Sequence, residues 1–339
     1  MMLILQHGAD MRRREFLGVV GVAIAMRPRA VRAQRADAMR VVGILMGPGG
    51  DSITRGRVTA FQNAMRELGW TEGRNIRFEV RWGEGDIDRT RTLASELVSL
   101  TPDVILAVST PAIAVLKKST HSIPLVFVIV NDPVAQGFVS SVAHPGGNIT
   151  GFSFIDFATL SKTLQLLKQA APEVNRVGFL FNPDSYPYYE VYLKSLRGER
   201  QEGALDVTAL RVHSEAEIEQ AFEVFATAPG AGLVVPPEPF TSAHRKLVVK
   251  LAAQFRVPAA YGLRDFVTDG GMMFYGPNNT DIFIRSASYI DRILKGANAG
   301  ELPVQAPTKF DFVINAKTAH ALGIAIPANL LALADEVIE

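Results

Sequence analysis

Leu125-Val126-Phe127-Val128-Ile129-Val130 is an unbroken apolar run that is followed at once by Asn131-Asp132-Pro133. A strand that is apolar on both faces is typical of a parallel sheet that helices cover on each side. Proline just after a polar residue is typical of the first turn of a helix. The stretch therefore predicts a buried strand of an α/β sheet, with a polar loop at its carboxyl end.

The same pattern of an apolar run followed by a helical stretch repeats along the chain. In the helical stretches apolar residues lie three or four apart, as at Val58, Phe61 and Met65. Alternating strands and helices of this length predict βαβ units and parallel sheets. The pattern fills two blocks, residues 40–131 and 175–261, which predicts two Rossmann-like lobes. The expected strands are Val41–Met46, Ile76–Trp82, Val104–Val108, Leu125–Val130, Arg176–Phe181, Val207–Val212, Gly232–Val235 and Val257–Tyr261.

Three segments are expected to cross between the lobes. The first is the glycine-rich bend Pro145–Gly151, the second is Gly270–Gly276, and the third is Pro303–Ile314. A helix over Asp281–Lys295 is expected between the last two. Three crossings indicate a hinged body with a ligand cleft between its lobes.

The predicted fold class is α/β, with two Rossmann-like lobes of parallel strands joined by a three-crossing hinge. The crossings make both lobes discontinuous in sequence. The N-terminal lobe is expected to hold residues 38–151 and 278–303, and the C-terminal lobe residues 152–277 and 304–339.

The N-terminus has the features of an export signal. Arg12-Arg13-Arg14 precedes an apolar stretch, Gly18–Met26, and a small-x-small site ends at Ala33. That stretch has about half of the ~20 residues that span a bilayer, and the paired arginines resemble a twin-arginine signal that starts at Met11. We predict that residues 1–33 are an export signal, cleaved near Ala33, and that the protein is periplasmic. The alternative is a basic N-terminus on a cytosolic protein.

Charge and composition exclude several classes of protein. The chain has 35 basic and 34 acidic residues, but residues 1–33 hold six arginines and two acids, so the remainder has 29 against 32, a net charge of −3. This balance, without a basic stripe, argues against nucleic acid as a partner. The chain has no cysteine and its histidines are scattered, so neither a metal site nor a disulfide is expected.

Candidate ligand-binding residues follow the predicted strands. In open parallel sheets, ligands bind beyond the carboxyl ends of the strands, where free N–H groups at helix starts suit a carboxylate. Ser109 and Thr110 are expected to receive such a carboxylate, Asp132 an amino group, and Tyr186 and Tyr261 an apolar or flat part of the ligand. Helix capping or core packing is the alternative role for each. The full set is Ser109, Thr110, Asn131, Asp132, Asn182, Tyr186, Glu238 and Tyr261.

A dinucleotide site is the main alternative, because Gly47-Pro48-Gly49 follows a strand and precedes a helix. The fingerprint G-x-G-x-x-G is incomplete, since Ser52 stands at its third glycine, and Pro48 removes an N–H. There is also no nucleophile elbow, no P-loop and no other catalytic constellation. We therefore expect no enzyme and no cofactor, and keep an exported nucleotide-dependent oxidoreductase as the alternative. A ligand-sensing domain of a membrane receptor is a third hypothesis.

Several short motifs after residue 33 are distinctive. They are Leu68-Gly69-Trp70-Thr71-Glu72-Gly73-Arg74-Asn75, Asn131-Asp132-Pro133-Val134, His144-Pro145-Gly146-Gly147-Asn148-Ile149-Thr150-Gly151, Arg264-Asp265-Phe266, Tyr275-Gly276-Pro277 and Pro307-Thr308-Lys309-Phe310. Together they resemble the motifs of the ABC-transporter substrate-binding protein family related to the tryptophan- and tyrosine-binding proteins. The resemblance covers essentially the whole chain after residue 33. It implies a type I periplasmic binding protein fold, capture of a small solute between the lobes, delivery to membrane permease subunits of an ABC importer, and no turnover.

The resemblance implies contacts from Ser109, Thr110, Asp132, Asn182 and Glu238. An aromatic or branched amino acid, or a related carboxylate, is the expected solute, and a monomer is the expected state. Two departures from the family pattern concern the ligand. The loop Gly47–Gly50 lacks serines that relatives carry, and Gly262-Leu263 stands where relatives carry Glu-Trp.

Overall fold

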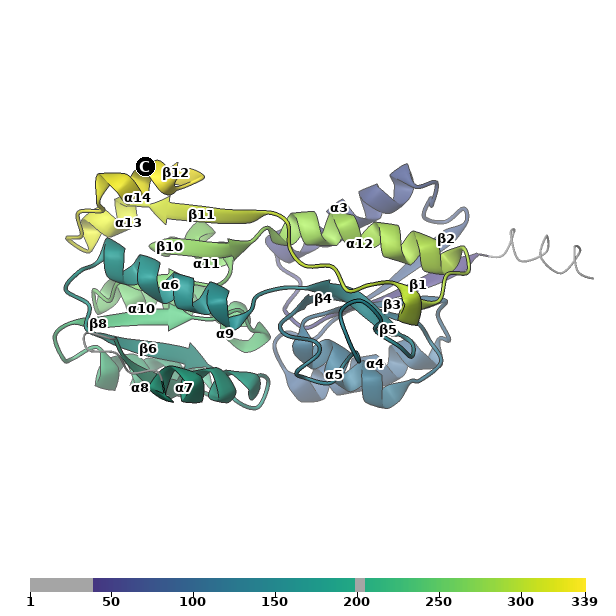
Figure 1. Ribbon diagram of the computed structural model, residues 1–339, viewed down its shortest axis with the longest axis horizontal. Coiled ribbons are helices and arrows are strands. Elements are labelled where there is room, and N and C mark those ends of the chain that lie inside the picture. Colours follow the sequence, from purple (N-terminus) through teal and green to yellow (C-terminus); the bar gives the residue numbers. More distant parts are fainter. Residues whose placement is uncertain (1–38, 199–204) are drawn as a thin grey trace, which may run out of the picture.

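The protein has two α/β lobes that lie side by side along its long axis (Figure 1). The computed structural model describes residues 39–198 and 205–339. The predicted export signal, residues 1–33, lies outside the described residues. Within the described part, no helix is both long and apolar enough to cross a membrane.

The first sheet has five parallel strands in the order β2-β1-β3-β4-β5. The four strands expected in this block are all present. They are β1 (Arg40–Met46), β2 (Ile76–Trp82), β3 (Val104–Val108) and β4 (Leu125–Val130), and the fifth is β5 (Ile149–Ser153).

The prediction that the bend Pro145–Gly151 leads directly out of the first lobe is wrong, because its end belongs to strand β5. Its residues pair with β4, and Ile149 and Phe152 are buried. Gly151 lies so close to Phe127 of β4 that a Cβ atom would clash with its backbone and ring. The sequence pattern suggested that Gly151 belongs to a turn. In the structure this glycine instead permits close pairing of β5 with β4.

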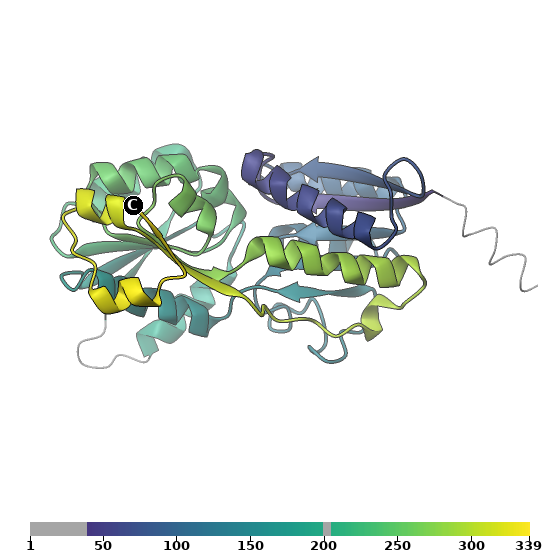
Figure 2. The same ribbon diagram turned by 90° about the horizontal axis from the view of Figure 1, so that it is seen from above.

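Two helices cover each face of the first sheet. Helices α3 (Ser52–Glu67) and α12 (Asn279–Leu294) pack against each other on one face, and α4 (Ile87–Ser99) and α5 (Thr110–Ser119) on the other. Helix α12 is the helix expected near 281–295, and it joins the first lobe although it follows the second in sequence (Figure 2).

The second sheet has seven strands in the order β12-β11-β10-β9-β8-β6-β7. They are β6 (Arg176–Phe181), β7 (Asp206–Arg211), β8 (Ala231–Val235), β9 (Ala259–Tyr261), β10 (Met273–Pro277), β11 (Phe310–Asn315) and β12 (Glu336–Ile338). Neighbours pair in parallel except β10 and β11, which are antiparallel. The exception has a topological reason: β10 ends toward the first lobe, and after α12 the chain returns from that lobe as β11.

Helices of the second lobe flank this sheet (Figure 1). They are α6 (Phe157–Ala170), α7 (Tyr188–Gly198), α8 (Glu215–Phe225), α9 (Pro239–Ala243), α10 (Arg245–Gln254), α11 (Arg264–Thr268), α13 (Ala316–Ala321) and α14 (Ala328–Leu333); the short 3₁₀ helix η1 (Ala299–Glu301) packs against β5. The α/β fold class with two lobes is confirmed.

The chain passes between the lobes after β5, after β10 and before β11. The last passage runs beside the first, because the Gln305 N–H donates to the Gly151 carbonyl at 2.9 Å and the Ser153 N–H donates to the Gln305 carbonyl at 2.9 Å. The second crossing was expected at Gly270–Gly276, but most of this stretch is strand β10. The chain crosses to the first lobe just after β10, at Asn278. The second passage also lies beside the last one, because the Asn278 N–H donates to the Lys309 carbonyl at 3.0 Å.

Candidate ligand-binding site between the lobes

A cavity lies where the carboxyl ends of the two sheets face each other. Its solvent volume is about 40 Å³, room for a few water molecules. Residues from both lobes line it: Pro48, Arg57, Val108, Ser109, Ile129 and Asn279 on the first, and Tyr186, Pro237, Glu238, Pro239, Ser242 and Leu263 on the second. Of the residues predicted from sequence, Ser109, Tyr186 and Glu238 line this cavity.

Two buried polar atoms of the cavity wall have no hydrogen-bond partner in the described part of the chain. They are the Ser109 hydroxyl oxygen and the Asn279 side-chain carbonyl oxygen. The two residues are only 6% and 7% exposed. An unmet hydrogen bond costs about 1–3 kcal/mol for each buried group. A site built to bind a polar solute accounts for both.

Backbone strain is concentrated at the same edge of the first sheet. Ser109, Ile129 and Asp132 have φ angles of 97°, 56° and 38°. Positive φ is unfavourable for residues with a side chain and especially for a β-branched one such as Ile129. The pairing of β4 also shifts register between Val128 and Val130. Strain of this kind gathers at ligand sites.

Ser109 precedes helix α5 but does not cap it, since its side chain accepts no bond from the helix. Thr110 begins α5, and its hydroxyl lies 2.8 Å from the Tyr186 hydroxyl of the other lobe. Burial raises the pKa of Tyr186, so its phenol stays neutral. The start of α5 thus lies against the second lobe, beside an unpartnered serine hydroxyl. Helix starts favour anions, although Pro111 in this first turn carries no N–H.

Glu238 is a buried carboxylate in the cavity wall. Its oxygens accept bonds from the Thr241 N–H at 2.6 Å, the Phe240 N–H at 2.7 Å and the Ser185 hydroxyl at 3.1 Å. It therefore caps α9 while it faces the cavity. Burial raises the pKa of the Glu238 carboxyl, although these hydrogen bonds favour its charged form.

Asn131 and Asp132 contact the second lobe outside the cavity wall. The Tyr188 hydroxyl donates to Asp132 at 2.6 Å, and the Asn131 amide donates to the Tyr189 hydroxyl at 3.2 Å. Together with the Thr110–Tyr186 pair we call these bonds the tyrosine contacts. They join β4 and α5 of the first lobe to the start of α7 of the second.

The two remaining predicted residues, Asn182 and Tyr261, do not line the cavity. Asn182 accepts from the Asp184 N–H at 2.8 Å and so stabilises its own turn. Tyr261 is 1% exposed and stacks on Phe266 at a centroid distance of 4.7 Å. Asn182 instead lines a separate hollow of about 480 Å³, together with Glu84 and Asp86 of the first lobe.

Charged residues join the lobes on the other side of the cavity. Arg57 of α3 makes a bidentate pair with Asp265 of α11, with one bond of 2.9 Å. Arg245 of α10 lies 2.5 Å from Asp51 of the first lobe and 2.6 Å from Asp269. We call these pairs the ion-pair contacts.

Sequence reasoning did not single out Arg57 and Asn279. A signal for Arg57 was present, because it lies on the buried face of α3 with Thr54, Val58 and Phe61. An arginine on an apolar helix face is a buried charge that needs a partner. Asn279 had no comparable signal, since it lies in a polar stretch after Pro277.

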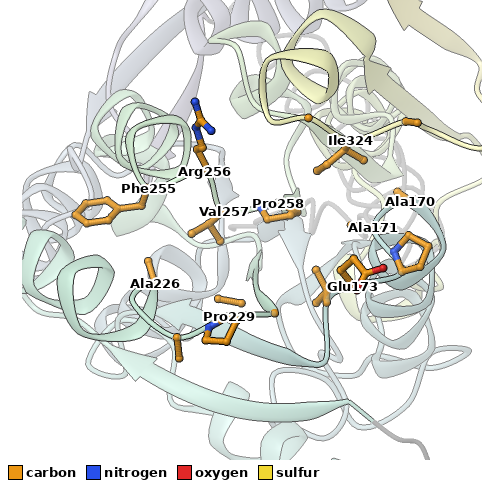
Figure 3. A pocket seen from close by; sticks show the side chains of 17 residues that line it. Ala170, Ala171, Glu173, Ala226, Pro229, Phe255, Arg256, Val257, Pro258 and Ile324 are labelled. Atoms are coloured by element: carbon orange, nitrogen blue, oxygen red, sulfur yellow. The ribbon is translucent and has the colours of Figure 1, made fainter.

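A larger hollow of about 380 Å³ lies at the far end of the second lobe (Figure 3). Loops that precede β6, β8 and β9 form it, and Figure 3 shows mostly small or apolar side chains around it, such as Ala226 and Ile324, together with the charged Glu173 and Arg256. None of the unpartnered buried polar atoms of the described residues lies there. The cavity between the lobes is the better candidate site.

Comparison with known proteins identifies the family. Residues 39–338 match the family described as ABC transporter substrate binding protein. The chain belongs to this family. Across the ranges 39–198 and 205–339, no group of three or more histidines and carboxylates is placed to hold a metal ion.

Three relatives are informative. A tyrosine-binding protein of Clostridioides difficile is 27% identical over 262 residues, which are 77% of this chain and 75% of the relative. A Streptococcus pneumoniae ABC domain in complex with L-Trp matches with a TM-score of 0.80 at 24% identity, over 89% of this chain and 100% of that one. The ligand-free, open structure of a substrate binding protein with adhesive properties from Clostridium difficile has a TM-score of 0.63 at 24% identity, over 89% and 99%.

These structural matches show the fold of this chain. In the structure described here the two lobes touch directly, through hydrogen bonds and ion pairs.

Proposed function

We propose that this substrate-binding protein captures an aromatic amino acid, such as tyrosine or tryptophan, between its lobes in the periplasm. It would then deliver the solute to the permease subunits of an ABC importer, without chemical turnover. The observation that carries the proposal is the cavity between the lobes, whose wall contains two buried polar atoms without partners. The substrates named for two relatives, tyrosine and L-Trp, supply the ligand class.

The cavity wall suits the two charged groups of an amino acid. Ser109 and the start of α5 would receive the carboxylate, because helix N-termini and hydroxyls stabilise anions. Glu238, whose buried carboxylate lines the cavity, would receive the amino group. Tyr186 would contact the apolar part of the solute. Asp132, which the sequence suggested for the amino group, stays a second candidate for that role.

Binding on this scheme requires the lobes to separate and close again. The cavity of about 40 Å³ is too small for an aromatic amino acid, because ligand pockets have volumes of about 300–1,000 Å³. The predicted lobes, residues 38–151 with 278–303 and 152–277 with 304–339, would then move as bodies about the three passages. A solute that contacts both lobes favours the closed form by its extra affinity for it.

Calorimetric titration of the protein from Gln34 to Glu339 with L-Tyr, L-Trp, L-Phe and L-Leu tests the proposal. At least one aromatic amino acid is expected to bind with a Kd below about 100 μM, and Ser109→Ala is expected to weaken binding at least about fivefold. A thermal-shift measurement provides an independent check, since a ligand at a hundred times its Kd adds about 2.7 kcal/mol of stability. Absence of binding by all four would contradict the proposal.

The oxidoreductase alternative has no support from the glycine-rich loop. Gly47 lies against Ser109 and the Val108 carbonyl, so that a Cβ atom there would clash. Close packing explains this glycine without a pyrophosphate. Titration with NADH separates the hypotheses, because the alternative requires saturable binding of the dinucleotide.

Periplasmic delivery depends on the export signal predicted at residues 1–33. Expression of the full chain is expected to yield a periplasmic protein whose N-terminus is Gln34. Replacement of Arg12 and Arg13 by lysine is expected to retain the precursor in the cytoplasm if the twin-arginine route is used. N-terminal sequencing of the fractionated protein measures both outcomes.

A further inference from the structure

We infer that the site selects solutes whose side chain ends in a neutral hydrogen-bond donor, and that Asn279 recognises this donor. The inference rests on the proposed function and specifies its substrate class. Tyrosine, with a phenol hydroxyl, and tryptophan, with an indole N–H, belong to the class. Phenylalanine does not.

Asn279 is placed at the cavity for a role other than helix capping. Helix α12 starts at Asn279, but the preceding Asn278 caps it, with its side-chain oxygen accepting from the Asp281 N–H at 3.0 Å. The Asn279 carbonyl oxygen is left buried and without a partner, in a residue that is 7% exposed and lines the cavity. A capping duty therefore does not explain this oxygen.

The unpartnered atom defines the chemistry of its ligand. A side-chain carbonyl oxygen only accepts hydrogen bonds, so its partner must be a donor. A solute that fills the cavity without a donor at this point leaves the oxygen buried and unmet. Binding of such a solute is disfavoured by about ten- to hundredfold relative to one that supplies the bond.

The charge nearby favours a neutral donor over an ammonium group. Asn279 belongs to α12, which packs along α3, and Arg57 of α3 lines the same cavity. A ligand ammonium at this end would meet the Arg57 guanidinium, whose charge is already matched by Asp265. Glu238, on the loop after β8, offers a carboxylate for the ammonium instead.

The wall of the cavity also has apolar residues. Val108, Ile129 and Leu263 line it together with Pro48 and Pro237. A solute with an apolar body, the charged groups of an amino acid and a neutral donor matches this composition. Ring-bearing amino acids with a hydroxyl or N–H on the ring have this composition.

Two matched pairs of probes test the inference by calorimetry with the protein from Gln34 to Glu339. L-Tyr and L-Phe differ by the phenol hydroxyl, and L-Trp and 1-methyl-L-tryptophan differ by the indole N–H. The unmodified protein is expected to prefer the donor-bearing member of at least one pair at least about tenfold. Asn279→Leu is expected to reduce that preference to less than about twofold, mainly by loss of affinity for the donor-bearing member.

Control variants separate this role from a general loss of the site. Asn279→Asp keeps an acceptor and is expected to keep the preference, whereas Ser109→Ala is expected to weaken both members of a pair by the same factor. Equal affinity within both pairs in the unmodified protein would overturn the inference while the proposed function stands. The inference would also be overturned if Asn279→Leu retained the preference, or if this variant lost affinity for both members of a pair by the same factor. If no probe binds, the proposed function fails and this inference with it.

Discussion

The two sides of the cavity join the same lobes by different chemistry. The tyrosine contacts are hydrogen bonds between Tyr186, Tyr188 and Tyr189 and polar residues at the ends of β3 and β4. The ion-pair contacts on the other side bring together Arg57 with Asp265, and Arg245 with Asp51 and Asp269. Asp132 is the one carboxylate among the tyrosine contacts defined above.

If the lobes open and close as proposed, this difference predicts different roles for the two sides. Neutral hydrogen bonds exchange readily with water, since each contributes only about 0.5–1.5 kcal/mol net. A buried ion pair is costly to leave half-formed, because the remaining charge lies in a poorly solvated place. The tyrosine side can therefore open at low cost, whereas the ion-pair side favours either the fully closed or the fully open arrangement.

Removal of Arg57 is expected to have the largest effect. Arg57→Ala leaves Asp265 without a partner in the closed form, a cost of about 3–5 kcal/mol that opening of the lobes relieves. The radius of gyration of the ligand-free protein, measured by X-ray scattering, is expected to increase. The double variant Arg57→Met with Asp265→Leu removes both charges and is expected to stay closed. If Arg57→Ala has the same radius of gyration as the unmodified protein, this ion pair does not hold the lobes closed.

Tyr186→Phe is expected to have an intermediate effect. It removes the hydrogen bond between the Tyr186 and Thr110 hydroxyls, which lie 2.8 Å apart, and both residues are buried, so the cost is about 1–3 kcal/mol. Ligand affinity is expected to fall about tenfold or more, as calorimetry would show. Tyr192→Phe is the matched control, because the Tyr192 hydroxyl lies 3.4 Å from Ser161 within the second lobe. Equal affinity loss in both variants would show that the tyrosine effect is not specific to lobe closure.

Asp132 and Tyr188 share one bond, which allows their roles to be separated. Asp132→Ala and Tyr188→Phe each remove the 2.6 Å contact between the lobes. Because both residues are partly exposed, we expect each to weaken L-Tyr binding by the same factor, at a cost of about 1 kcal/mol. Loss of binding in Asp132→Ala alone would instead support the amino-group role predicted from sequence. Calorimetry of the two variants under one condition decides between these outcomes.

Acidification is expected to have the smallest effect near neutral pH. Burial alone would raise the pKa of Asp51, but hydrogen bonds from Thr54 and the charge of Arg245 lower it below its usual 3.8. A lowered pKa means that the pair is intact above the usual carboxyl range and is lost only as the pH falls through the lowered value. Scattering between about pH 7 and pH 3 should show opening only at the acid end, with a weaker dependence in Asp51→Asn. If the lobes already open near pH 6, a group other than Asp51 is responsible.

The sequence predicted the strands that are long and continuously apolar, such as β3, β4 and β6. It did not predict β5 and β10 as strands, because Gly151, Gly276 and Pro277 read as turn residues in a linear pattern. In the folded protein Gly151 permits close approach to Phe127, a requirement that depends on a neighbouring strand.

The candidate site shows the same division. Ser109, Tyr186 and Glu238 follow strands, and the rule that ligands bind beyond strand ends places them at the cavity. Arg57 and Asn279 lie on helices, and no rule of sequence order brings those helices to the cavity. Helix α12 reaches it only because the chain returns from the second lobe to pack on α3.

Apolar periodicity by itself determined the alternation of strands and helices and the division into two similar lobes, because local burial is encoded in residues near one another in the chain. The tertiary structure decided which polar atoms meet across the cavity and which remain without partners. Hydrogen bonds between Thr110 and Tyr186, or an unmet oxygen on Asn279, depend on the packing of segments that are far apart in sequence. Their energies come from burial at the lobe interface, which only the assembled fold creates.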